Sequence, residues 1–444
     1  YPFDEDHYLV AYCPEGWLGD YGPFVPPFGV YFMTATGERE LLAFDWWISS
    51  TQPIPILERP IPPIRPSQID FTKNMGSFDI QDVYFGPGLK GIPHGTVKRL
   101  RVVALEYRAG KIGKGWNAGE VSSGLIQTPI SFNSGSWDVK HVLGEVEIEK
   151  DGSVAFQVPA RTPVYFQLLD DKGYCVQTMR SWATLQPGER FSCLGCHEDK
   201  LDTKGMVQGR LTSVAMQKPA QKLKPIRSKK HPLIERLEKE SALASLENYF
   251  GVNAPPVSAD PNAHSDGFSY LQEVQPVWDK HCVSCHGGPD VKPDEHKKIK
   301  PALPDLRGTP LSVSDRKVAS DDDHKRLYAQ SYLTLTNNGT LKGNKYIQFL
   351  EVRSRSEMLP PYHTGSSKSP LMKFLESSHY NVQVSDSEKR TVACWIDLLI
   401  PYCGSYPEAN IWTEEEREIW KGLIRKRRAF AQQELDSIIK SVKK

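Results

Sequence analysis

Two copies of one five-residue pattern constrain this sequence more than any other feature. Cys193-Leu194-Gly195-Cys196-His197 and Cys282-Val283-Ser284-Cys285-His286 both read C-x-x-C-H. Two thiols at this spacing can add to the vinyl groups of one haem, and the adjacent histidine then lies below the iron. One match could be half of a zinc site, but two complete copies favour two covalently attached haem c groups. We therefore expect attachment at Cys193, Cys196, Cys282 and Cys285, with His197 and His286 as metal ligands.

Bulk properties narrow the class of protein. A chain of 444 residues predicts two or three domains. Its 55 basic and 54 acidic side chains nearly cancel, which gives no argument for binding nucleic acid. No apolar run reaches the ~18–20 residues of a transmembrane helix. Covalent haem attachment belongs to the periplasm or an equivalent extracytoplasmic compartment, so we expect that localisation. Because no Met precedes Tyr1, we expect a processed chain or a fragment.

Residues 1–200 predict a strand-rich β-sandwich domain that carries the first haem motif. Short β-rich segments recur between turn signals at Thr36-Gly37-Glu38, Asp151-Gly152 and Asp171-Lys172-Gly173. A proline-dense run over residues 53–66 predicts an extended surface strap. The expected strands are residues 6–12, 30–33, 39–44, 82–85, 97–105, 142–148, 153–158, 163–169 and 174–179.

The rest of the chain predicts helices. Residues 201–262 are a Lys/Pro-rich linker with one helix, from Leu233 to Phe250. Residues 263–405 predict an α-helical cytochrome c domain, because a helix over 268–281 runs directly into the second motif. Ser385-Asp386-Ser387-Glu388 is a capping box that opens the helix expected to cross it. Residues 406–444 end in an amphipathic helix from Thr413, which packs either on the chain itself or on a partner.

Several stretches resemble one family. They are Glu38-Arg39-Glu40-Leu41-Leu42, Pro62-Pro63-Ile64-Arg65-Pro66-Ser67, Asp82-Val83-Tyr84, Gly95-Thr96-Val97-Lys98, Asp151-Gly152-Ser153, Met179-Arg180-Ser181, Pro360-Pro361-Tyr362 and Gly365-Ser366. With the two motifs they resemble the α subunit of hydrazine synthase and related multidomain haem proteins. The resemblance implies the two haems and a β-propeller before this region. The family's iron-ligating tyrosine, four residues after the first-motif histidine, is Leu201 here, so hydrazine synthesis itself is not implied.

The ligands on the far side of each iron are open. For the second haem, the loop from Arg355 to Ser366 offers Met358 and His363, whereas His379, at the end of the following helix, is expected to be a surface residue. The resemblance favours His363, because the family uses two histidines on this haem. For the first haem, the candidates are a histidine or methionine of the first domain (His7, His94, His141, Met33, Met75 or Met179) or no ligand at all.

Two functions follow from these alternatives. If both irons are saturated, the chain is a periplasmic dihaem c-type cytochrome that transfers electrons within a hydrazine synthase-like complex. If the first iron is open, the chain is a haem-dependent oxidoreductase acting on a nitrogen compound. Either function implies a redox partner or other subunits, among them a propeller-containing chain. The four other cysteines, Cys13, Cys175, Cys394 and Cys403, are either buried thiols or the disulfides Cys394–Cys403 and Cys13–Cys175.

Overall fold

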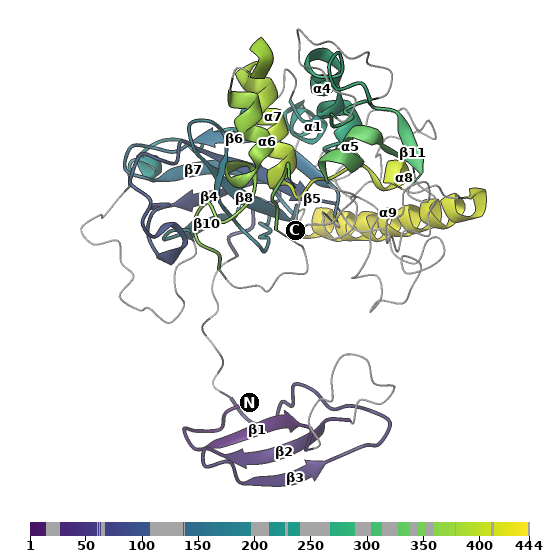
Figure 1. Ribbon diagram of the computed structural model, residues 1–444. Coiled ribbons are helices and arrows are strands. Elements are labelled where there is room, and N and C mark those ends of the chain that lie inside the picture. Colours follow the sequence, from purple (N-terminus) through teal and green to yellow (C-terminus); the bar gives the residue numbers. More distant parts are fainter. Residues whose placement is uncertain are drawn as a thin grey trace. The chain divides into compact units, whose positions relative to one another are not determined.

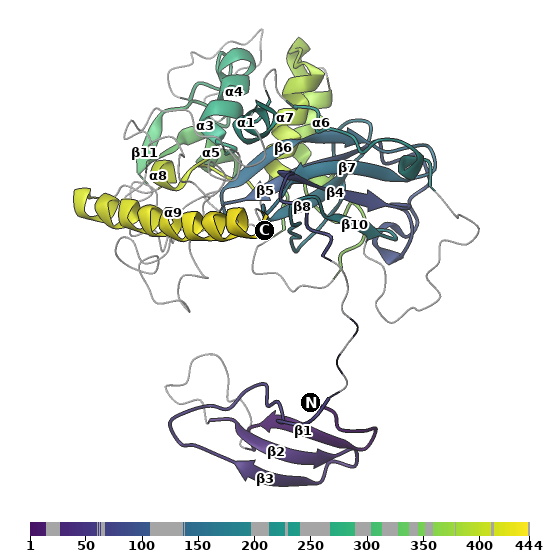
Figure 2. The same ribbon diagram turned by 180° about the vertical axis from the view of Figure 1, so that it is seen from behind.

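The computed structural model divides the chain into two compact units, Tyr1–Ser67 and Gln68–Lys444, shown in Figures 1 and 2. The expected boundaries near residues 200, 262 and 405 stay predictions. The structure describes residues 1–14, 27–59, 61, 63, 67–106, 136, 138–196, 213–226, 230–239, 267–288, 303–312, 327–336, 345–350, 358–377, 379–409 and 413–442.

The first unit is a small antiparallel sheet. Its strands β1 (His7–Tyr12), β2 (Gly29–Thr34) and β3 (Arg39–Ala43) lie in that order, which confirms the three strands predicted here. The predicted turn is also present, because Gly37 has a φ of +91° that an L side chain rarely adopts. Trp46 and Trp47, which follow β3, are largely exposed.

A four-stranded antiparallel sheet organises the second unit. Its order is β6-β5-β8-β9, with β5 at Arg99–Leu105, β6 at Lys140–Glu147, β8 at Val164–Leu169 and β9 at Cys175–Thr178. The turn between β8 and β9 contains Gly173 at a φ of +87°, as the Asp-Lys-Gly signal predicts. Each of these strands was predicted within two residues of its observed ends.

A three-stranded sheet packs against one face of the four-stranded sheet. It contains β10 (Arg190–Cys193), β4 (Met75–Ile80) and β7 (Val154–Pro159), with β10 parallel to β4. The core between the two sheets includes Phe78, Leu100, Phe156 and Leu168. The strand expected at residues 82–85 is wrong, because Phe85 N–H closes a turn onto Asp82 O instead.

Short helices cover the opposite face of the four-stranded sheet, and one long helix closes the chain (Figures 1 and 2). Besides these, the second unit has the small β11–β12 pair (Pro310–Ser312 with Leu327–Ala329) and several 3-10 turns. The helices are α1 (Pro232–Lys239), α3 (Tyr270–Glu273), α4 (Gln275–His281), α5 (Gln330–Leu335), α6 (Pro370–Glu376), α7 (Asp386–Asp397), α8 (Tyr406–Ala409) and α9 (Glu414–Val442). No helix in the described part of the chain is long and apolar enough to cross a bilayer.

The expected fold class, a β-sandwich domain followed by an α-helical cytochrome c domain, is wrong. The described residues form a mixed α and β unit without a large separate helical domain. The reason lies in β5, whose side chains are buried on both faces. Leu100 and Val102 face the three-stranded sheet, whereas Val103 joins the core of the helices, which also contains Trp278 and Trp395. Sheet and helices therefore share a core.

Candidate functional site

The second C-x-x-C-H motif begins where α4 ends. Trp278 O accepts hydrogen bonds from the N–H groups of Cys282 (2.8 Å) and Val283 (3.0 Å). Cys282 O then accepts from the N–H groups of Cys285 (3.1 Å) and His286 (2.9 Å). The motif therefore continues the helical path for one more turn and holds both cysteines and the histidine in a compact loop.

His286 is oriented by a segment that lies 18 residues further along. Its Nδ1 is 3.0 Å from Pro304 O, and its backbone O accepts from Leu306 N–H at 2.8 Å. A carbonyl can only accept, so Nδ1 carries the proton and Nε2 keeps a lone pair. A ring N–H fixed in this way is the usual support of a metal-binding histidine.

His379 lies opposite His286. The ring centroids are 6.2 Å apart and the ring planes are inclined by 27°. Metal–nitrogen bonds to imidazole are about 2 Å long, so two rings that share one metal ion have centres about 6 Å apart. His379 begins the turn after α6 (His379–Asn381) and also contacts Phe374. Its spacing from His286 would therefore allow both rings to hold one iron.

The charged side chains around α4 join it to α7. Glu388, in the first turn of α7, accepts hydrogen bonds from Lys280 Nζ at 2.9 Å and His281 Nε2 at 3.1 Å. It also accepts from Ser385 N–H at 2.9 Å and completes the predicted capping box, which is confirmed. Glu388 thus fixes the start of α7 against the end of α4, directly before Cys282.

A buried polar network fixes the other side of α4. Trp278 Nε1 donates to Tyr270 Oη (2.9 Å), which donates to Ser331 Oγ (2.9 Å), and Ser331 donates to Gln275 Oε1. Gln275 Nε2 donates in turn to Leu306 O at 3.1 Å. The network links α4 to the segment whose Pro304 orients His286, so the ligand geometry is set by the core.

The electrostatics of this site suit metal and haem attachment. Burial lowers the pKa of His286, which favours the neutral imidazole that can bind a metal. Burial raises the pKa of Cys282 to about 11, so this residue is a thiol at neutral pH. Two half-buried cysteines, an oriented histidine and a facing histidine fit a c-type haem. Among the described residues, no group of three or more His, Cys, Asp and Glu side chains gathers to form another kind of metal centre.

The first motif begins at the end of β10. Cys193 pairs with Ile80 in the parallel register, and its backbone O accepts from Gln81 N–H at 3.0 Å. Leu194 O accepts from Asp82 N–H at 3.1 Å. A Cβ on Gly195 would lie 2.2 Å from Phe85 O, so only glycine fits there. The loop 81–85, where a strand was expected, thus holds the motif in place.

The surroundings of the first motif are apolar and aromatic. Cys193 and Cys196 are half-buried and pack against the core between the two sheets, together with Tyr84, Phe166 and Tyr362. His197, the predicted ligand of the first haem, and Leu201 lie outside the described residues. The walls that the structure describes fit a haem edge, and the iron ligation at His197 stays a prediction.

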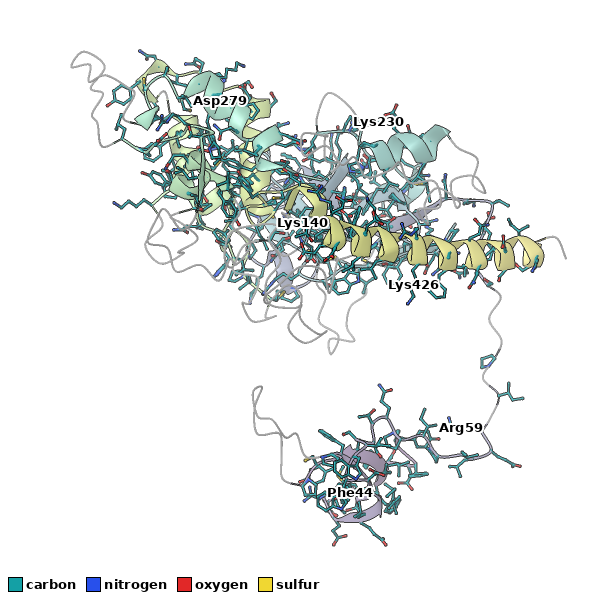
Figure 3. All side chains as sticks on the ribbon, turned by 90° about the vertical axis from the view of Figure 1, so that its right-hand side faces the viewer. Phe44, Arg59, Lys140, Lys230, Asp279 and Lys426 are labelled. Atoms are coloured by element: carbon teal, nitrogen blue, oxygen red, sulfur yellow. The ribbon has the colours of Figure 1, made fainter. Side chains whose placement is uncertain are left out.

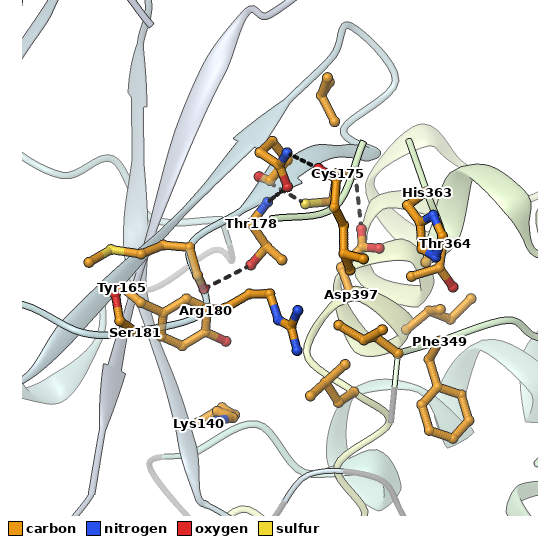
Figure 4. A pocket seen from close by; sticks show the side chains of 18 of the residues that line it. Lys140, Tyr165, Cys175, Thr178, Arg180, Ser181, Phe349, His363, Thr364 and Asp397 are labelled. Atoms are coloured by element: carbon orange, nitrogen blue, oxygen red, sulfur yellow. Dashed lines mark hydrogen bonds between the residues drawn. The ribbon is translucent and has the colours of Figure 1, made fainter. Parts of the chain in front are cut away.

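His363 lines a pocket of 240 Å³ (Figure 4). Its walls include β9 and parts of the segment 359–365. Within the described residues no ring contact joins His363 to His286. The assignment of His363 to the second iron stays a prediction, and the geometry instead favours His379. Met358, the other candidate, is 37% exposed. The sequence predicted a surface position for His379, because its spacing from His286 carries no motif.

The same pocket contains a buried carboxyl group. Asp397 Oδ atoms accept from Ser366 N–H (2.8 Å), Ser366 Oγ (2.7 Å) and Cys175 N–H (3.2 Å). Burial raises the pKa of Asp397 to about 6, although these hydrogen bonds oppose the rise. Figure 4 shows Cys175 and Asp397 on one wall and Arg180 reaching in from the strand side. The Cys175 thiol donates to Gln177 O at 3.3 Å, so the structure has this residue as a thiol.

Comparisons with known proteins bear on the first motif. Residues 95–198, which include the whole first motif, match a family model described as the hydrazine synthase alpha subunit middle domain. A 236-residue stretch is 27% identical to hydrazine synthase subunit alpha of Kuenenia stuttgartiensis. Over these stretches the chain is similar to the hydrazine synthase α subunit.

The chain spans only part of the length of the proteins that it matches. The match covers 44% of this chain and 27% of the Kuenenia subunit. The solved structure of Kuenenia stuttgartiensis hydrazine synthase aligns with 91% of this chain and 55% of that chain, at 16% identity and a TM-score of 0.47. The two sequence matches thus confirm the predicted resemblance.

Proposed function

We propose that this chain is a dihaem c-type cytochrome that transfers electrons within a hydrazine synthase-like complex in the periplasm or an equivalent compartment. The observation that carries the proposal is the pairing of His286, oriented by Pro304 O, with His379 at 6.2 Å between ring centroids. Two histidines that saturate an iron leave no position for a substrate, which is the arrangement of an electron relay.

Each motif contains the residues that would attach one haem. Cys282 and Cys285 would hold the second haem, and Cys193 and Cys196 the first, each pair next to its histidine. The haem groups would supply one-electron transfer when bound. The hydrogen bond from His286 Nδ1 to Pro304 O would keep this ring in the tautomer that binds iron. The relation to a multi-subunit enzyme supports other subunits as the redox partners.

A second candidate function is a haem-dependent oxidoreductase with an open first iron. The pocket of 240 Å³ favours it, because its wall includes Cys175 and the chain beside it reaches the first motif. Val176, which lines the pocket, accepts a hydrogen bond from Tyr362 N–H at 2.8 Å, and Tyr362 packs on the same core as Cys193 and Cys196. In this second candidate function the pocket would admit a small molecule beside the first motif.

The test is a spectroscopic count on the full chain, produced in a host that attaches haem c. A pyridine haemochrome assay should give two haems per chain, and Cys282→Ala/Cys285→Ala should give one. The matched control Cys175→Ala, which removes a buried thiol outside both motifs, should still give two. No covalent haem in the unaltered chain would refute both functions.

Ligand binding then separates the two functions. EPR of the oxidised chain with two low-spin signals, neither altered by cyanide, supports the relay. One high-spin signal that responds to cyanide and survives in Cys282→Ala/Cys285→Ala places an open iron at the first motif and supports the oxidoreductase instead.

A further inference from the structure

Helix α9 leaves an apolar stripe uncovered. Ile419, Leu423 and Phe430 are 50%, 44% and 60% exposed. At about 100° per residue these three positions fall within one narrow band of the helix surface. Trp420 and Ile438 lie about a quarter turn away and are buried against the rest of the second unit. The helix therefore packs on its own chain along one side and presents a second apolar side outward.

Two small residues beside the stripe permit another helix to come close. Gly422 and Ala429 lie two turns apart on its flank. A Cβ on Gly422 would meet Arg425 Nη2 at 3.8 Å, an ordinary contact, so no contact with the described residues requires a glycine here. Glycine is unfavourable in a helix interior and is useful where another backbone approaches closely. Its position in the interior of a 29-residue helix, at the ninth residue, fits the approach of a second helix.

The charges of α9 are divided along its length. Glu414, Glu415, Glu416 and Glu418 occupy its first five positions, and Arg425, Lys426, Arg427 and Arg428 follow in its middle. Ion pairs within the helix join Glu414 and Glu418 to Lys421, at 3.6 and 2.7 Å, on the side away from the stripe. Glu415 and Lys426, which flank the stripe, have no ion pair with any described residue; Figure 3 labels Lys426.

We propose that this stripe is the contact with a second copy of this chain, with the two α9 helices antiparallel and centred near Lys421. In that register Ile419 lies against Leu423 of the second copy, and Glu415 lies beside its Lys426. The acidic beginning of each helix faces the basic middle of the other. A parallel pair would place like charges side by side. The self-complementary charge pattern is what selects a second copy as the occupant.

The contact is small, so the association should be reversible and dependent on concentration. A single helix pair with two central apolar residues on each side, Ile419 and Leu423, lies at the low end of specific interfaces, because Phe430 falls beyond the start of the other helix. The energy of such a contact is concentrated in its central apolar side chains. Ile419 and Leu423 hold that central position, which makes them the residues to change first.

The test is sedimentation equilibrium of the full chain over a range of concentrations. Leu423→Glu should raise the dissociation constant of the dimer by at least about tenfold. Leu327→Glu, which changes a leucine of similar exposure (50%) on β12, should leave the constant unchanged. Circular dichroism melting of each variant at low concentration checks that the monomer is folded.

Charge reversal tests the register independently of the apolar contact. Glu415→Lys and Lys426→Glu should each weaken the dimer several-fold, and the double variant should restore it, because the reversed pair is again complementary. A chain that stays monomeric at all concentrations overturns the proposal. So does a dimer that tolerates Leu423→Glu, or a double variant weaker than either single one.

Discussion

The rings of His286 and His379 face each other with their centroids 6.2 Å apart, although 92 residues separate them in the sequence. His286 is fixed by Pro304 O, and His379 is placed by the turn that follows α6. The turn is held from within, since Val382 N–H donates to His379 O at 3.0 Å. The His286 ring is therefore oriented by a backbone carbonyl, and the His379 ring packs against Phe374 and Tyr380.

Replacement of His379 by alanine should convert the second haem from a low-spin to a high-spin centre. The loss of one axial nitrogen leaves an open position, so the altered iron should also bind CO. EPR and CO difference spectra of the chain carrying both haems measure this change. His363→Ala is the control and should leave the second haem low-spin. If His363→Ala opens the iron and His379→Ala does not, His363 is the ligand.

The sequence could predict half of this site. The C-x-x-C-H spacing is local, so Cys282, Cys285 and His286 follow from the chain itself. The facing ligand depends on where α6 ends in space, and neither His363 nor His379 carries a local signal. His363 precedes α6 and lines a different pocket, whereas His379 follows α6. The two candidates lie one helix length apart along the chain. Residue spacing alone does not tell which of them faces His286.

The fold shows the same limit. Strands such as β5 and β8 follow from alternation, and their ends were predicted closely. The grouping of the strands into sheets could not be predicted from the sequence. The strands β6 and β7 are joined by the Asp151-Gly152 turn, yet they belong to different sheets. Arg101 makes one face of β5 look polar in the sequence. In the structure this side chain is only 1% exposed and donates hydrogen bonds to Glu145 and Gln167. Because of this buried ion pair, the sequence did not indicate that the second face of β5 is buried as well.

Gly195→Ala should disturb the first motif and leave the second intact. The added Cβ would lie 2.2 Å from Phe85 O, and because both sides are backbone the loop itself must move. We expect a loss of about 1–3 kcal/mol in stability and incomplete attachment at Cys193 and Cys196. Haem content by mass spectrometry and thermal melting measure both effects. Gly308→Ala, whose Cβ would meet only the Gln275 side chain at 3.3 Å, should keep both haems. Full attachment in Gly195→Ala would contradict the tight fit.

Glu388→Gln should weaken the junction of α4 with α7 at neutral pH but not in acid. Burial opposes ionisation of Glu388, but hydrogen bonds from Lys280, Ser385 and His281 outweigh it and hold its pKa well below the usual value. A lowered carboxyl pKa stabilises the fold above the unfolded pKa of 4.5, and this stability is lost as the pH falls through the folded pKa. Lys280 is largely exposed, so about 1 kcal/mol is expected.

Chemical denaturation at several pH values measures the effect of Glu388→Gln. The difference from the unaltered chain should be present at pH 7 and shrink below pH 4.5. Asp386→Asn, which changes a carboxylate that is 90% exposed on the same helix turn, should have a smaller effect at every pH. A Glu388→Gln deficit that stays constant into acid would show that the charge is not what joins the helices.

Asp397 should make the fold less stable as the pH rises through about 6. Its folded pKa is raised from 3.8 to about 6, so the folded chain binds the proton more tightly than the unfolded chain does. The associated stability is fully present below pH 3.8 and is lost as the pH rises through 6, at up to about 1.4 kcal/mol per pH unit. Asp397→Asn, which cannot ionise, should flatten this part of the pH profile. Melting temperatures between pH 4 and 8 measure it, with Asp386→Asn again as the control. An unchanged slope in Asp397→Asn would mean that the three hydrogen bonds from Ser366 and Cys175 keep this carboxylate ionised, and the pocket that it lines would then be anionic across the whole range.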